Sequence, residues 1–571
     1  MVKLLRVNMK KKQFKFEKLR IDYKQFGGRA LIGKLMLDEV EPTCNPLGPE
    51  NKIIFANGLF VGTSFPCPGR ISVGSKSPLT GGIKESNAGG LAATRMGQLG
   101  LRGIVIEEVP EEDELFTLVI SKDKVEFIKL LELKGMGNYE TVAKLRDKWG
   151  EKIATLSIGP AGEQLLAGAS VAISDLYGNP SRHAGRGGMG AVLGSKKVKA
   201  LVLLRPNKPE QEPIKNLNQF KKLTKEYNKI LIPRKRGLTV YGTAALVRVT
   251  NELGGLPTKN FRKGTFDQVE NISGEKLHEI ITSRGGKTTE ACSPGCIIRC
   301  SNRYVDKEGN YITSGLEYET IVLNGSNLLI GDLDILARID RTCDDMGLDT
   351  IEMGNALAVA MEAELLQWGD GEGAISLLRE IAEGTLKAKI IGSGAATAGR
   401  VLGVSRVTQC KGQGFPAYDP RIFKGMGATY ATSPMGADHT AGPAIPGRIG
   451  WDIKNPEDYG DLKESKGKIK LTRELQIMVA LCDAFGFCFF VWPDLNFLIE
   501  VINAKYDWKF DFNRLVAHGK LILLNEHEFN KRAGVPQDNQ LPALFYNEKL
   551  PPSNKEFDLG PEELKEVIDS L

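Results

Sequence analysis

The chain has 571 residues, of which 26% are charged and 42% are hydrophobic, a composition that excludes a disordered protein. Its 76 Lys and Arg residues barely exceed its 70 Asp and Glu residues, which excludes a protein dedicated to nucleic-acid binding. Because no run of about 18 apolar residues could span a membrane and the N-terminus lacks a signal-peptide core, we expect a large cytoplasmic protein of about three or four domains, with neither nucleic-acid nor membrane partners.

The first third of the chain is predicted to be mostly β-structure. Short apolar and β-branched runs separated by glycine-rich turns are typical of strands. These runs cover residues 3–8, 13–19, 52–55, 103–106, 116–120 and 200–204. The polar, proline-rich stretch 205–213 is typical of a linker between domains. We therefore expect a β-rich base domain over residues 1–206.

The rest of the chain is predicted to be mainly helical. Apolar residues recur at helical spacing over residues 333–343 and 471–482, and residues 356–366 are rich in helix formers. Gly560 is followed by a proline and two acids, as at many helix N-termini. The Gly- and Pro-rich stretch 412–450 is expected to be mostly loop. The predicted fold class is therefore α+β and multidomain, with two mainly α-helical domains, 207–410 and 411–571, after the base domain.

One pattern occurs twice in the helical part. Asp344-Asp-Met-Gly-Leu-Asp349 and Asp483-Ala-Phe-Gly-Phe-Cys488 each follow an amphipathic segment and place a glycine where a helix C-cap is expected. Asp349 and Glu352 are expected to cap the next helix together. One such pattern is common at helix ends, but two matching copies indicate two equivalent half-sites that hold two similar groups.

Three cysteines lie close together in Cys292-Ser-Pro-Gly-Cys296-Ile-Ile-Arg-Cys300. The chain has nine cysteines, an odd number, and no export signal, which argues against a disulfide framework. Thiolates this close repel one another unless a metal neutralises them, and soft sulfur suits iron–sulfur clusters, zinc or copper(I). Three thiols with a distant fourth, Cys488, favour a [4Fe–4S] cluster, with a structural zinc site as the alternative.

Two glycine-rich elements are candidates for binding anions. Gly185-Arg-Gly-Gly-Met-Gly190 matches a dinucleotide-binding fingerprint, but we expect neither a strand before it nor a helix after it and reject that fold. The other element is Ser86-Asn-Ala-Gly-Gly90. Their bare amides, with the guanidinium groups of Arg70, Arg182 and Arg186, suit phosphate groups, although ordinary turns with solvated arginines have the same composition.

Three further motifs supply groups that could act on a substrate. Glu317 lies in Glu-Tyr-Glu-Thr, Tyr418 in Pro-Ala-Tyr-Asp-Pro-Arg and His439 in Gly-Ala-Asp-His. Each of these residues, taken singly, is more often structural than catalytic. Their interpretation depends on whether they converge, which a single sequence does not show.

Together these motifs make the sequence similar to the tungsten-dependent aldehyde:ferredoxin oxidoreductase family over essentially the whole chain. The resemblance is carried by Pro68-Gly-Arg, Ser86-Asn-Ala-Gly-Gly, Ser181-Arg-His-Ala-Gly-Arg-Gly-Gly-Met-Gly-Ala-Val-Leu-Gly-Ser-Lys196, the three cysteines, Glu317-Tyr-Glu-Thr, both Asp-x-x-Gly motifs, Pro416-Ala-Tyr-Asp-Pro-Arg and Gly436-Ala-Asp-His.

The resemblance implies a metal centre between the base domain and the helical domains. In that family a tungsten ion is held by two pyranopterin dithiolenes near one [4Fe–4S] cluster, and this sequence does not distinguish tungsten from molybdenum. The implied cluster ligands are Cys292, Cys296, Cys300 and Cys488. The implied contacts to the pterins and their phosphates are Arg70, Asn87, Gly89, Arg182, His183, Arg186, Asp344, Leu348, Asp349 and Asp483, with Asn87 and the His183 carbonyl at the magnesium that links the phosphates.

The sequence departs from the family pattern in several places. The cysteines are spaced Cys-x3-Cys-x3-Cys rather than Cys-x2-Cys-x3-Cys, and Gly414 replaces an acid. Thr440 follows His439 where many relatives carry a bulkier residue. No histidine lies between His278 and His439, so a histidine-bound iron at a homodimer interface is not expected. The chain is short for the family, which fits pairing with a small polyferredoxin subunit.

The leading hypothesis is oxidation of a small aldehyde to its carboxylic acid. Glu317 would act as the base, with Glu319 as its nearest rival, while Tyr418 and His439 would polarise the carbonyl group. Electrons would pass through the cluster to ferredoxin or a ferredoxin-like subunit, in a homo- or hetero-oligomer. The alternatives are a related tungsten subunit that reduces an aryl-CoA and a zinc-stabilised binding or scaffold protein.

Overall fold

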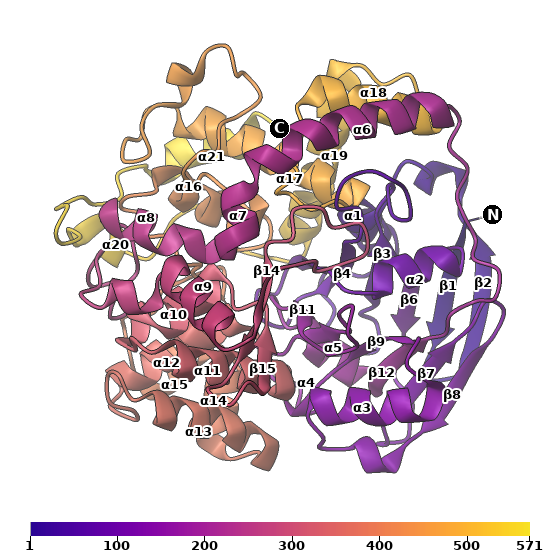
Figure 1. Ribbon diagram of the computed structural model, residues 1–571, viewed down its shortest axis with the longest axis horizontal. Helices are drawn as coiled ribbons and strands as arrows, with labels where there is room; N and C mark the ends of the chain where they lie inside the picture. Colours follow the sequence, from indigo (N-terminus) through magenta and orange to yellow (C-terminus); the bar gives the residue numbers. More distant parts are fainter. Residues whose placement is uncertain (1) are drawn as a thin grey trace.

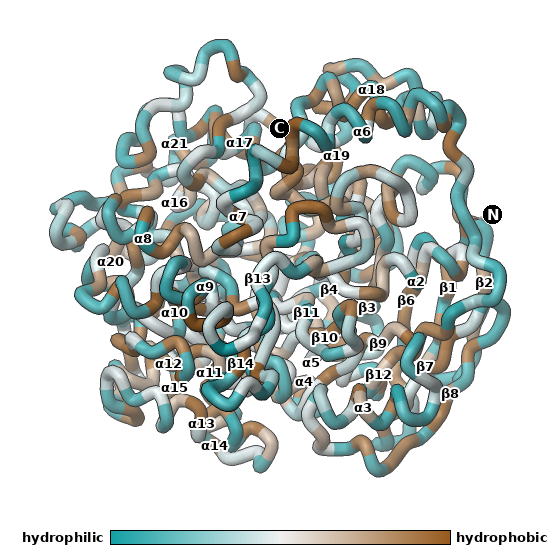
Figure 2. Tube along the Cα trace, viewed as in Figure 1, coloured by the Kyte–Doolittle hydropathy of each residue, from teal (hydrophilic) through white to brown (hydrophobic). Residues whose placement is uncertain are grey.

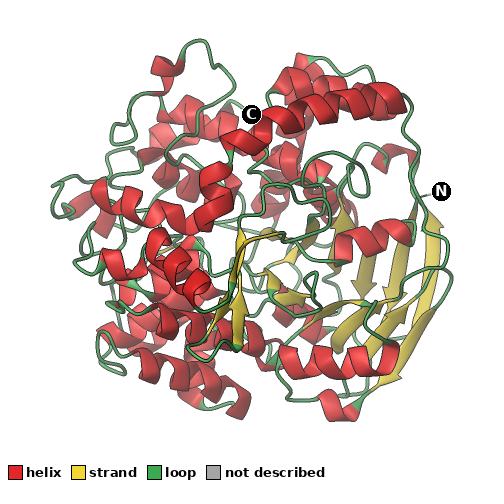
Figure 3. Cartoon of the chain, in the orientation of Figure 1, coloured by secondary structure: helices red, strands yellow, loops and turns green. Residues whose placement is uncertain are grey.

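The computed structural model describes residues 2–571. Two β-sheets built from the first part of the chain lie on the right in Figure 1, and most helices of residues 246–432 lie on the left (Figures 1 and 3). The helices of residues 217–234 and 495–532 lie above the sheets in the same view. This arrangement confirms the α+β, multidomain prediction with a β-rich N-terminal region followed by a helical region.

The first sheet has the strand order β2-β1-β6-β3-β4-β5. Its strands are β1 (Lys3–Asn8), β2 (Gln13–Lys18), β3 (Ile53–Asn57), β4 (Ile71–Lys76), β5 (Ile83–Ala88) and β6 (Leu101–Glu107). Only β1 and β6 pair in parallel; the other neighbours are antiparallel. Because Ser72 pairs with Asn87, the start of β4 and the end of β5 bring Arg70 and Asn87 side by side.

The second sheet has the order β11-β10-β9-β12-β7-β8. Its strands are β7 (Phe116–Ile120), β8 (Val125–Lys129), β9 (Ala154–Ser157), β10 (Val171–Ile173), β11 (Arg182–Ala184) and β12 (Val198–Leu203). One apolar core joins the facing sides of the two sheets, with Phe55 from the first and Leu201 from the second. Successive strand residues point to opposite faces, so Ile54 packs instead with Leu31 of α1 (Gly28–Glu39).

Helices account for most of the remaining structure. The N-terminal region also contains α2 (Ala92–Gln98), α3 (Asn138–Trp149), α4 (Pro160–Glu163) and α5 (Met189–Ser195). The later helices are α6 (Leu217–Arg234), α7 (Arg236–Tyr241), α8 (Leu246–Glu252), α9 (Gly274–Ser283), α10 (Tyr318–Asn324), α11 (Leu333–Met346), α12 (Thr350–Glu362), α13 (Gly371–Glu383), α14 (Leu386–Gly392), α15 (Ala395–Leu402), α16 (Lys424–Thr432), α17 (Lys468–Phe485), α18 (Leu495–Tyr506), α19 (Phe512–Arg532), α20 (Leu544–Asn547) and α21 (Pro561–Asp569). Two small sheets accompany them, β13 (Lys287–Glu290) with β14 (Ser301–Val305) and β15 (Tyr311–Ser314), and β16 (Gln409–Cys410) with β17 (Gln413–Gly414).

The strongest helix predictions are confirmed. The spacing over residues 333–343 belongs to α11 and that over 471–482 to α17. Gly347 and Gly486 cap these helices in the left-handed region, with φ of 74° and 75°. This conformation is accessible to glycine at little cost, so both glycines end their helices as predicted.

The stretch 412–450 is mostly loop as predicted, although it contains the buried helix α16. One local prediction was wrong. The glycine-rich motif from Gly185 to Gly190 does follow a strand, β11, and does lead into a helix, α5. A nucleotide-binding βαβ unit is nevertheless not formed, since the strand after α5, β12, pairs with β7 and β9 rather than with β11.

Apolar residues recur along the strands of both sheets (Figure 2).

Among residues 2–571 no single helix is long and apolar enough to cross a membrane. One bent pair, Tyr318–Leu328 with Leu333–Met346 at 116°, meets the requirement by length and composition only.

Candidate active site

A cavity of about 350 Å³ lies where the N-terminal sheets meet the helical region. Its walls include Arg70 just before β4, the end of β5, the strand β11, the helices α10, α11, α12 and α17, and the loop before His439. Every predicted site residue except Cys296 lines it: Arg70, Asn87, Gly89, Arg182, His183, Arg186, Cys292, Cys300, Glu317, Asp344, Leu348, Asp349, Tyr418, His439, Asp483 and Cys488. Residues spread over more than 400 positions of sequence are thus brought to one cavity.

The first Asp-x-x-Gly motif docks on the N-terminal region through its backbone. The Gly347 carbonyl accepts a hydrogen bond from the Ser170 N–H at 2.8 Å, and the Asp349 N–H donates to the Gly168 carbonyl at 3.0 Å. A Cβ on Gly347 would lie 2.7 Å from the Gly159 nitrogen. The motif therefore requires glycine for close approach as well as for its backbone conformation.

The second motif repeats these contacts with a different part of the N-terminal region. The Gly486 carbonyl accepts from the Arg70 N–H at 3.2 Å, and the Cys488 N–H donates to the Cys67 carbonyl at 3.0 Å. A Cβ on Gly58 would lie 2.1 Å from the Gly486 Cα, the counterpart of the close approach of Gly159 to Gly347. The sequence repeat thus corresponds to a structural repeat, which supports the prediction of two equivalent half-sites.

The carboxylate of Asp344 is held against His183. Its Oδ1 lies 3.0 Å from the His183 Nε2, and the Tyr139 hydroxyl donates to its Oδ2 at 3.4 Å. The His183 Nδ1 lies 2.7 Å from the Ser170 hydroxyl. Asp340, one helical turn earlier, also lines the cavity, and burial together with Asp344 raises its pKa well above the usual range. This half of the cavity therefore carries two closely spaced acids.

The carboxylate of Asp483 has a similar setting in the other half. Asn87 donates to its Oδ1 at 3.1 Å, and the buried Arg29 lies 3.4 Å from its Oδ2. Burial and the neighbouring Glu85 raise the pKa of Asp483, while Arg29 and Arg70 oppose that shift. Glu85 lines the cavity as well. Each half-site therefore combines a motif aspartate with a second buried acid.

The two arginines of the glycine-rich motif differ in their bonding. The Arg186 guanidinium donates to the carbonyls of Ala437 at 2.5 Å and Gly414 at 2.6 Å and to Asp349 Oδ2 at 3.2 Å. The Arg182 side chain makes no hydrogen bond or ion pair with any described residue, and its buried Nε has no partner. Arg182 is therefore the better candidate to meet an anionic group, whereas Arg186 ties the loop before His439 to α12.

The Asp349–Glu352 capping pair is only half formed. The Asp349 side chain accepts from the Ile351 N–H at 2.9 Å, as expected of an N-cap. Glu352 instead accepts from the Gly414 N–H at 2.8 Å and the Ala395 N–H at 2.9 Å. Burial raises its pKa to about 7 although the nearby Arg186 opposes this. The sequence thus identified the capping aspartate correctly and assigned the glutamate to the wrong partner.

The predicted cluster cysteines lie together at one end of the cavity. Cys292, Cys300 and Cys488 line it, and Cys296 adjoins Cys292, whose pKa is raised by that neighbouring thiol and by burial. Burial, Glu317 and the other thiols raise the pKa of Cys300. Among residues 2–571 no three His, Cys, Asp or Glu side chains converge as ligands of one metal ion do.

Two glycines allow the N-terminal region to approach the cysteine segment. The Gly90 N–H donates to the Cys292 carbonyl at 2.8 Å, and a Cβ on Gly89 would lie 3.0 Å from that oxygen. A Cβ on Gly69 would lie 2.7 Å from the Ser293 hydroxyl oxygen. Glycine at these positions lets the segments that carry Arg70 and Asn87 lie directly against the cysteine segment.

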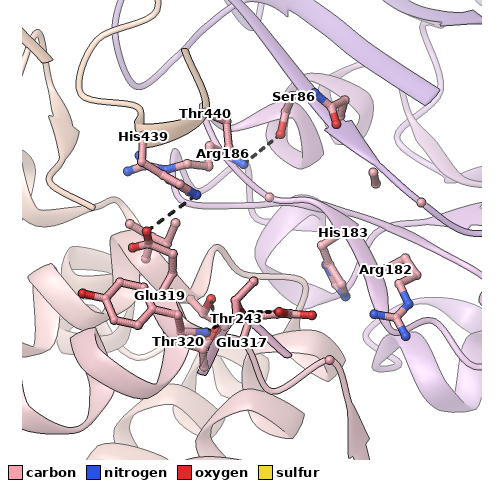
Figure 4. A pocket seen from close by; sticks show the side chains of 18 of the residues that line it. Ser86, Arg182, His183, Arg186, Thr243, Glu317, Glu319, Thr320, His439 and Thr440 are labelled. Atoms are coloured by element: carbon pink, nitrogen blue, oxygen red, sulfur yellow. Dashed lines mark hydrogen bonds and ion pairs between the residues drawn. The ribbon is translucent and has the colours of Figure 1, made fainter. Parts of the chain in front are cut away.

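The two candidate carboxylates at the start of α10, Glu317 and Glu319, lie in different parts of the cavity (Figure 4). Glu319 Oε1 lies 3.6 Å from His439 Nε2, and the rings of His439 and Tyr418 are 6.3 Å apart. Glu317 accepts a hydrogen bond from the Thr243 hydroxyl at 2.5 Å, and its negative charge contributes to the raised pKa of Cys300. Glu319, rather than Glu317, therefore shares the part of the cavity that holds Tyr418 and His439.

Burial affects both carboxylates. It raises the pKa of Glu319, a shift that His439 opposes, and it raises the pKa of Glu317, a shift that Thr243 and Arg182 oppose. The Oε2 of Glu319 accepts from the Ala417 N–H at 2.7 Å, whereas its buried Oε1 has no hydrogen-bond partner within residues 2–571. One oxygen of Glu319 thus anchors the side chain, and the other is buried beside His439 without a hydrogen-bond partner among the described residues.

Sequence reasoning missed several residues of this site. Asp438 accepts from the Lys84 ammonium at 2.5 Å and from the Thr440 N–H at 2.9 Å, which holds the backbone on both sides of His439. The positions of Asp438 beside His439 and of Glu85 beside Ser86 were the available signals. Lys84 and Thr243 belong to no recognisable pattern, and only the tertiary structure brings Thr243 to the cavity and Lys84 to Asp438.

Nearly the whole chain matches the aldehyde ferredoxin oxidoreductase family. Residues 4–205 match its N-terminal domain, and residues 220–571 match its domains 2 and 3. This match identifies the chain as an oxidoreductase. The chain belongs to the aldehyde ferredoxin oxidoreductase family.

Individual relatives agree with this assignment. The chain is 34% identical to a tungsten-containing aldehyde ferredoxin oxidoreductase of Pyrococcus furiosus and 33% identical to one of Thermococcus kodakarensis, covering 96% of this chain and 92% of each relative. A further P. furiosus relative, the WOR-like subunit of an aliphatic sulfonate oxidoreductase, is 26% identical over 78% of this chain and 76% of its own. The fold also resembles the active-site complex BamBC of benzoyl coenzyme A reductase, with a TM-score of 0.80 and 20% identity over 100% of this chain and 93% of that one.

Proposed function

We propose that this protein oxidises an aldehyde to its carboxylic acid at a tungsten bis-pterin centre in the cavity. The observation that carries the proposal is the structural repeat of the two Asp-x-x-Gly motifs, which gives two like half-sites beside four cysteines and the Glu319–His439–Tyr418 group. Two relatives that match nearly the whole chain are named tungsten-containing aldehyde ferredoxin oxidoreductases.

The residues present fit such a cofactor. Asp344, Asp349 and Asp483 offer carboxylate oxygens that can accept hydrogen bonds from pterin ring nitrogens, and the unpaired Arg182 suits a phosphate. Asn87 and His183 would meet a magnesium ion between the phosphates. Cys292, Cys296, Cys300 and Cys488 would ligate a [4Fe–4S] cluster. When bound, the tungsten centre would supply two-electron oxidation, and the cluster would supply one-electron transfer.

The chain's own residues would bind the aldehyde and move its protons. The reaction converts an aldehyde and water into a carboxylic acid, two protons and two electrons, and the electrons leave singly to a ferredoxin-like acceptor. We assign Glu319 Oε1 as the base that removes a proton from the adding water, because it is the unpaired oxygen beside His439. His439 and Tyr418 would donate hydrogen bonds to the carbonyl oxygen as negative charge develops there.

Metal analysis and two assays test the proposed function. Protein made anaerobically with tungstate should contain tungsten or molybdenum, iron and a pterin, and should reduce a viologen dye when given an aldehyde. Zinc without tungsten, molybdenum or iron would contradict the proposal. The fold likeness to BamBC makes aryl-CoA reduction the second candidate, and a protein that reduces an aryl-CoA but shows no aldehyde-dependent dye reduction would favour it.

Replacement of Cys488 tests the cluster assignment. Cys488→Ala should lose or convert the cluster, because one of four thiolates is removed, while the tungsten site stays largely assembled. Iron and sulfide analysis with electron paramagnetic resonance of the reduced protein would measure this. Cys410→Ala is the control, since Cys410 is a buried free cysteine that does not line the cavity. An unchanged [4Fe–4S] signal in Cys488→Ala would remove this residue from the ligand set.

A further inference from the structure

A cluster of positive charge lies on the surface next to the predicted cluster cysteines. It consists of Arg234, Lys235, Arg236, Arg299 and Arg448, and we call it the basic rim. Arg234, Arg236 and Arg299 are exposed, and Lys235 and Arg448 are half-buried. Within the described part of the chain, none of the five makes a salt bridge. Unpaired cations this close together are unfavourable unless a partner supplies the counter-charge.

Direct contacts tie the basic rim to the cysteines. Arg299 lies inside the cysteine segment, and its N–H donates to the Cys296 sulfur at 3.4 Å. The junction of α6 and α7 carries Arg234 to Arg236, and the Thr239 hydroxyl of α7 donates to the Ile298 carbonyl at 2.7 Å. The rim therefore surrounds the outer side of the cysteine segment, where Cys296 lies outside the cavity lining.

Arg448 extends the rim to the second cysteine motif. Its guanidinium lies 4.3 Å from the ring centre of Trp492 and 5.4 Å from that of Phe489, the residue after Cys488. Burial together with Arg448 and Arg234 lowers the pKa of Lys235 to about 8, an effect that Cys488 opposes. Burial is the main cause of this shift, and the two arginines add to it, so Arg234, Lys235 and Arg448 lie close enough to interact.

The rim also carries exposed apolar side chains. Ile230 and Ile232, near the end of α6, are 55% and 53% exposed. Ile230 precedes Arg234 by four positions within α6, so these two side chains lie on the same side of that helix. Ile232 lies in the last turn of α6, next to the break that leads into α7. A few apolar groups bordered by charges of one sign are typical of a surface for transient protein contacts.

We propose that the basic rim is the docking surface for a small, acidic, one-electron carrier protein of the iron–sulfur type. The surface is positive, borders apolar side chains and lies over the thiols through which electrons would leave the cavity. The carrier would take one electron at a time, so two dockings would complete the oxidation of one aldehyde. The inference rests on the proposed function for the presence of the cluster.

The test compares two double variants of the full-length, metal-loaded protein. Arg234→Glu/Arg236→Glu reverses two exposed charges of the rim, and Lys144→Glu/Lys148→Glu reverses two exposed charges on α3, which lies far from α6 in Figure 1. With a bacterial two-cluster ferredoxin at low salt, the rim variant should raise Kd and lower kcat/KM about 10- to 100-fold. The α3 variant should match the wild type, and the loss should shrink at high salt.

The outcomes separate the docking surface from the reaction. Dye reduction by the rim variant should equal that of the wild type, because a small dye does not need the surface. Unchanged Kd and kcat/KM for ferredoxin in the rim variant would overturn the docking proposal. The proposal would also fail if the rim variant lost affinity for poly(U) RNA but still bound ferredoxin like the wild type. If the wild type oxidises no aldehyde with dye, the proposed function fails. In that case the comparison of Kd values for ferredoxin by calorimetry still tests whether the basic rim is the docking surface.

Discussion

Glu319→Gln should lower kcat by about two to four powers of ten, the usual contribution of a general base. The amide keeps the shape of the side chain and can still meet the Ala417 N–H, but it cannot take a proton. Because burial raises the pKa of Glu319, the wild-type rate should fall on the acid side at a higher pH than an ordinary glutamate would give. Steady-state rates with a viologen acceptor over a pH series, normalised to tungsten, would measure both effects.

Glu317→Gln is the matched control, because Glu317 lies two residues before Glu319 at the start of α10. Its carboxylate bonds to Thr243 and faces the cysteines, so the amide should keep kcat within about tenfold and retain the acid limb of the pH profile. Metal and iron content should be unchanged in both variants. A large loss in Glu317→Gln with a fully active Glu319→Gln would reverse the assignment and restore the expectation from sequence.

Arg29→Met should cost about 3–5 kcal/mol of stability, because it leaves buried acids without their cation. Arg29 is 2% exposed, donates to both oxygens of Glu526 at 2.8 Å and lies 3.4 Å from Asp483. The loss should appear as a lower Tm and an earlier urea transition. Bound pterin should decrease too, since Asp483 lines the cavity.

The pH dependence of this loss follows from the acids left behind. Burial raises the pKa of Glu85 and of Asp483, and removal of Arg29 raises both further. An acid whose pKa is raised by folding stabilises the fold below its unfolded pKa and loses that contribution as pH rises through its folded pKa. The Tm difference from wild type should therefore grow with pH.

A second change provides the control for Arg29→Met. Arg29→Met/Glu526→Leu replaces the pair by apolar side chains and should recover much of the stability, because Glu526 no longer lacks a partner. If Arg29→Met alone melts like the wild type at neutral pH, the buried ion group does not stabilise the junction between α1 and α19.

Local sequence signals were sufficient where one segment determines its own structure. The strand at 116–120, the helix spacing of α11 and α17 and the C-cap glycines Gly347 and Gly486 were all predictable, because periodicity and backbone freedom act within a few residues. The motif repeat was also visible in sequence, and it predicted the structural repeat. Nearly all of the predicted site residues line the cavity, and they were identified through motifs rather than through contacts.

Tertiary packing decided the rest. The helix α16 is rich in glycine, alanine and threonine, with weak helix propensity at many positions, and it forms because it is buried on all sides. Residues two apart at the start of a helix point in different directions, so only the docking of α10 determines that Glu319 faces His439 while Glu317 faces the thiols. The partners of Arg186 likewise come from residues 349, 414 and 437, and no local pattern distinguishes it from Arg182. Interactions between distant segments cannot be inferred from spacing along one chain, because spacing carries no information on which side chain meets which across a packed interface.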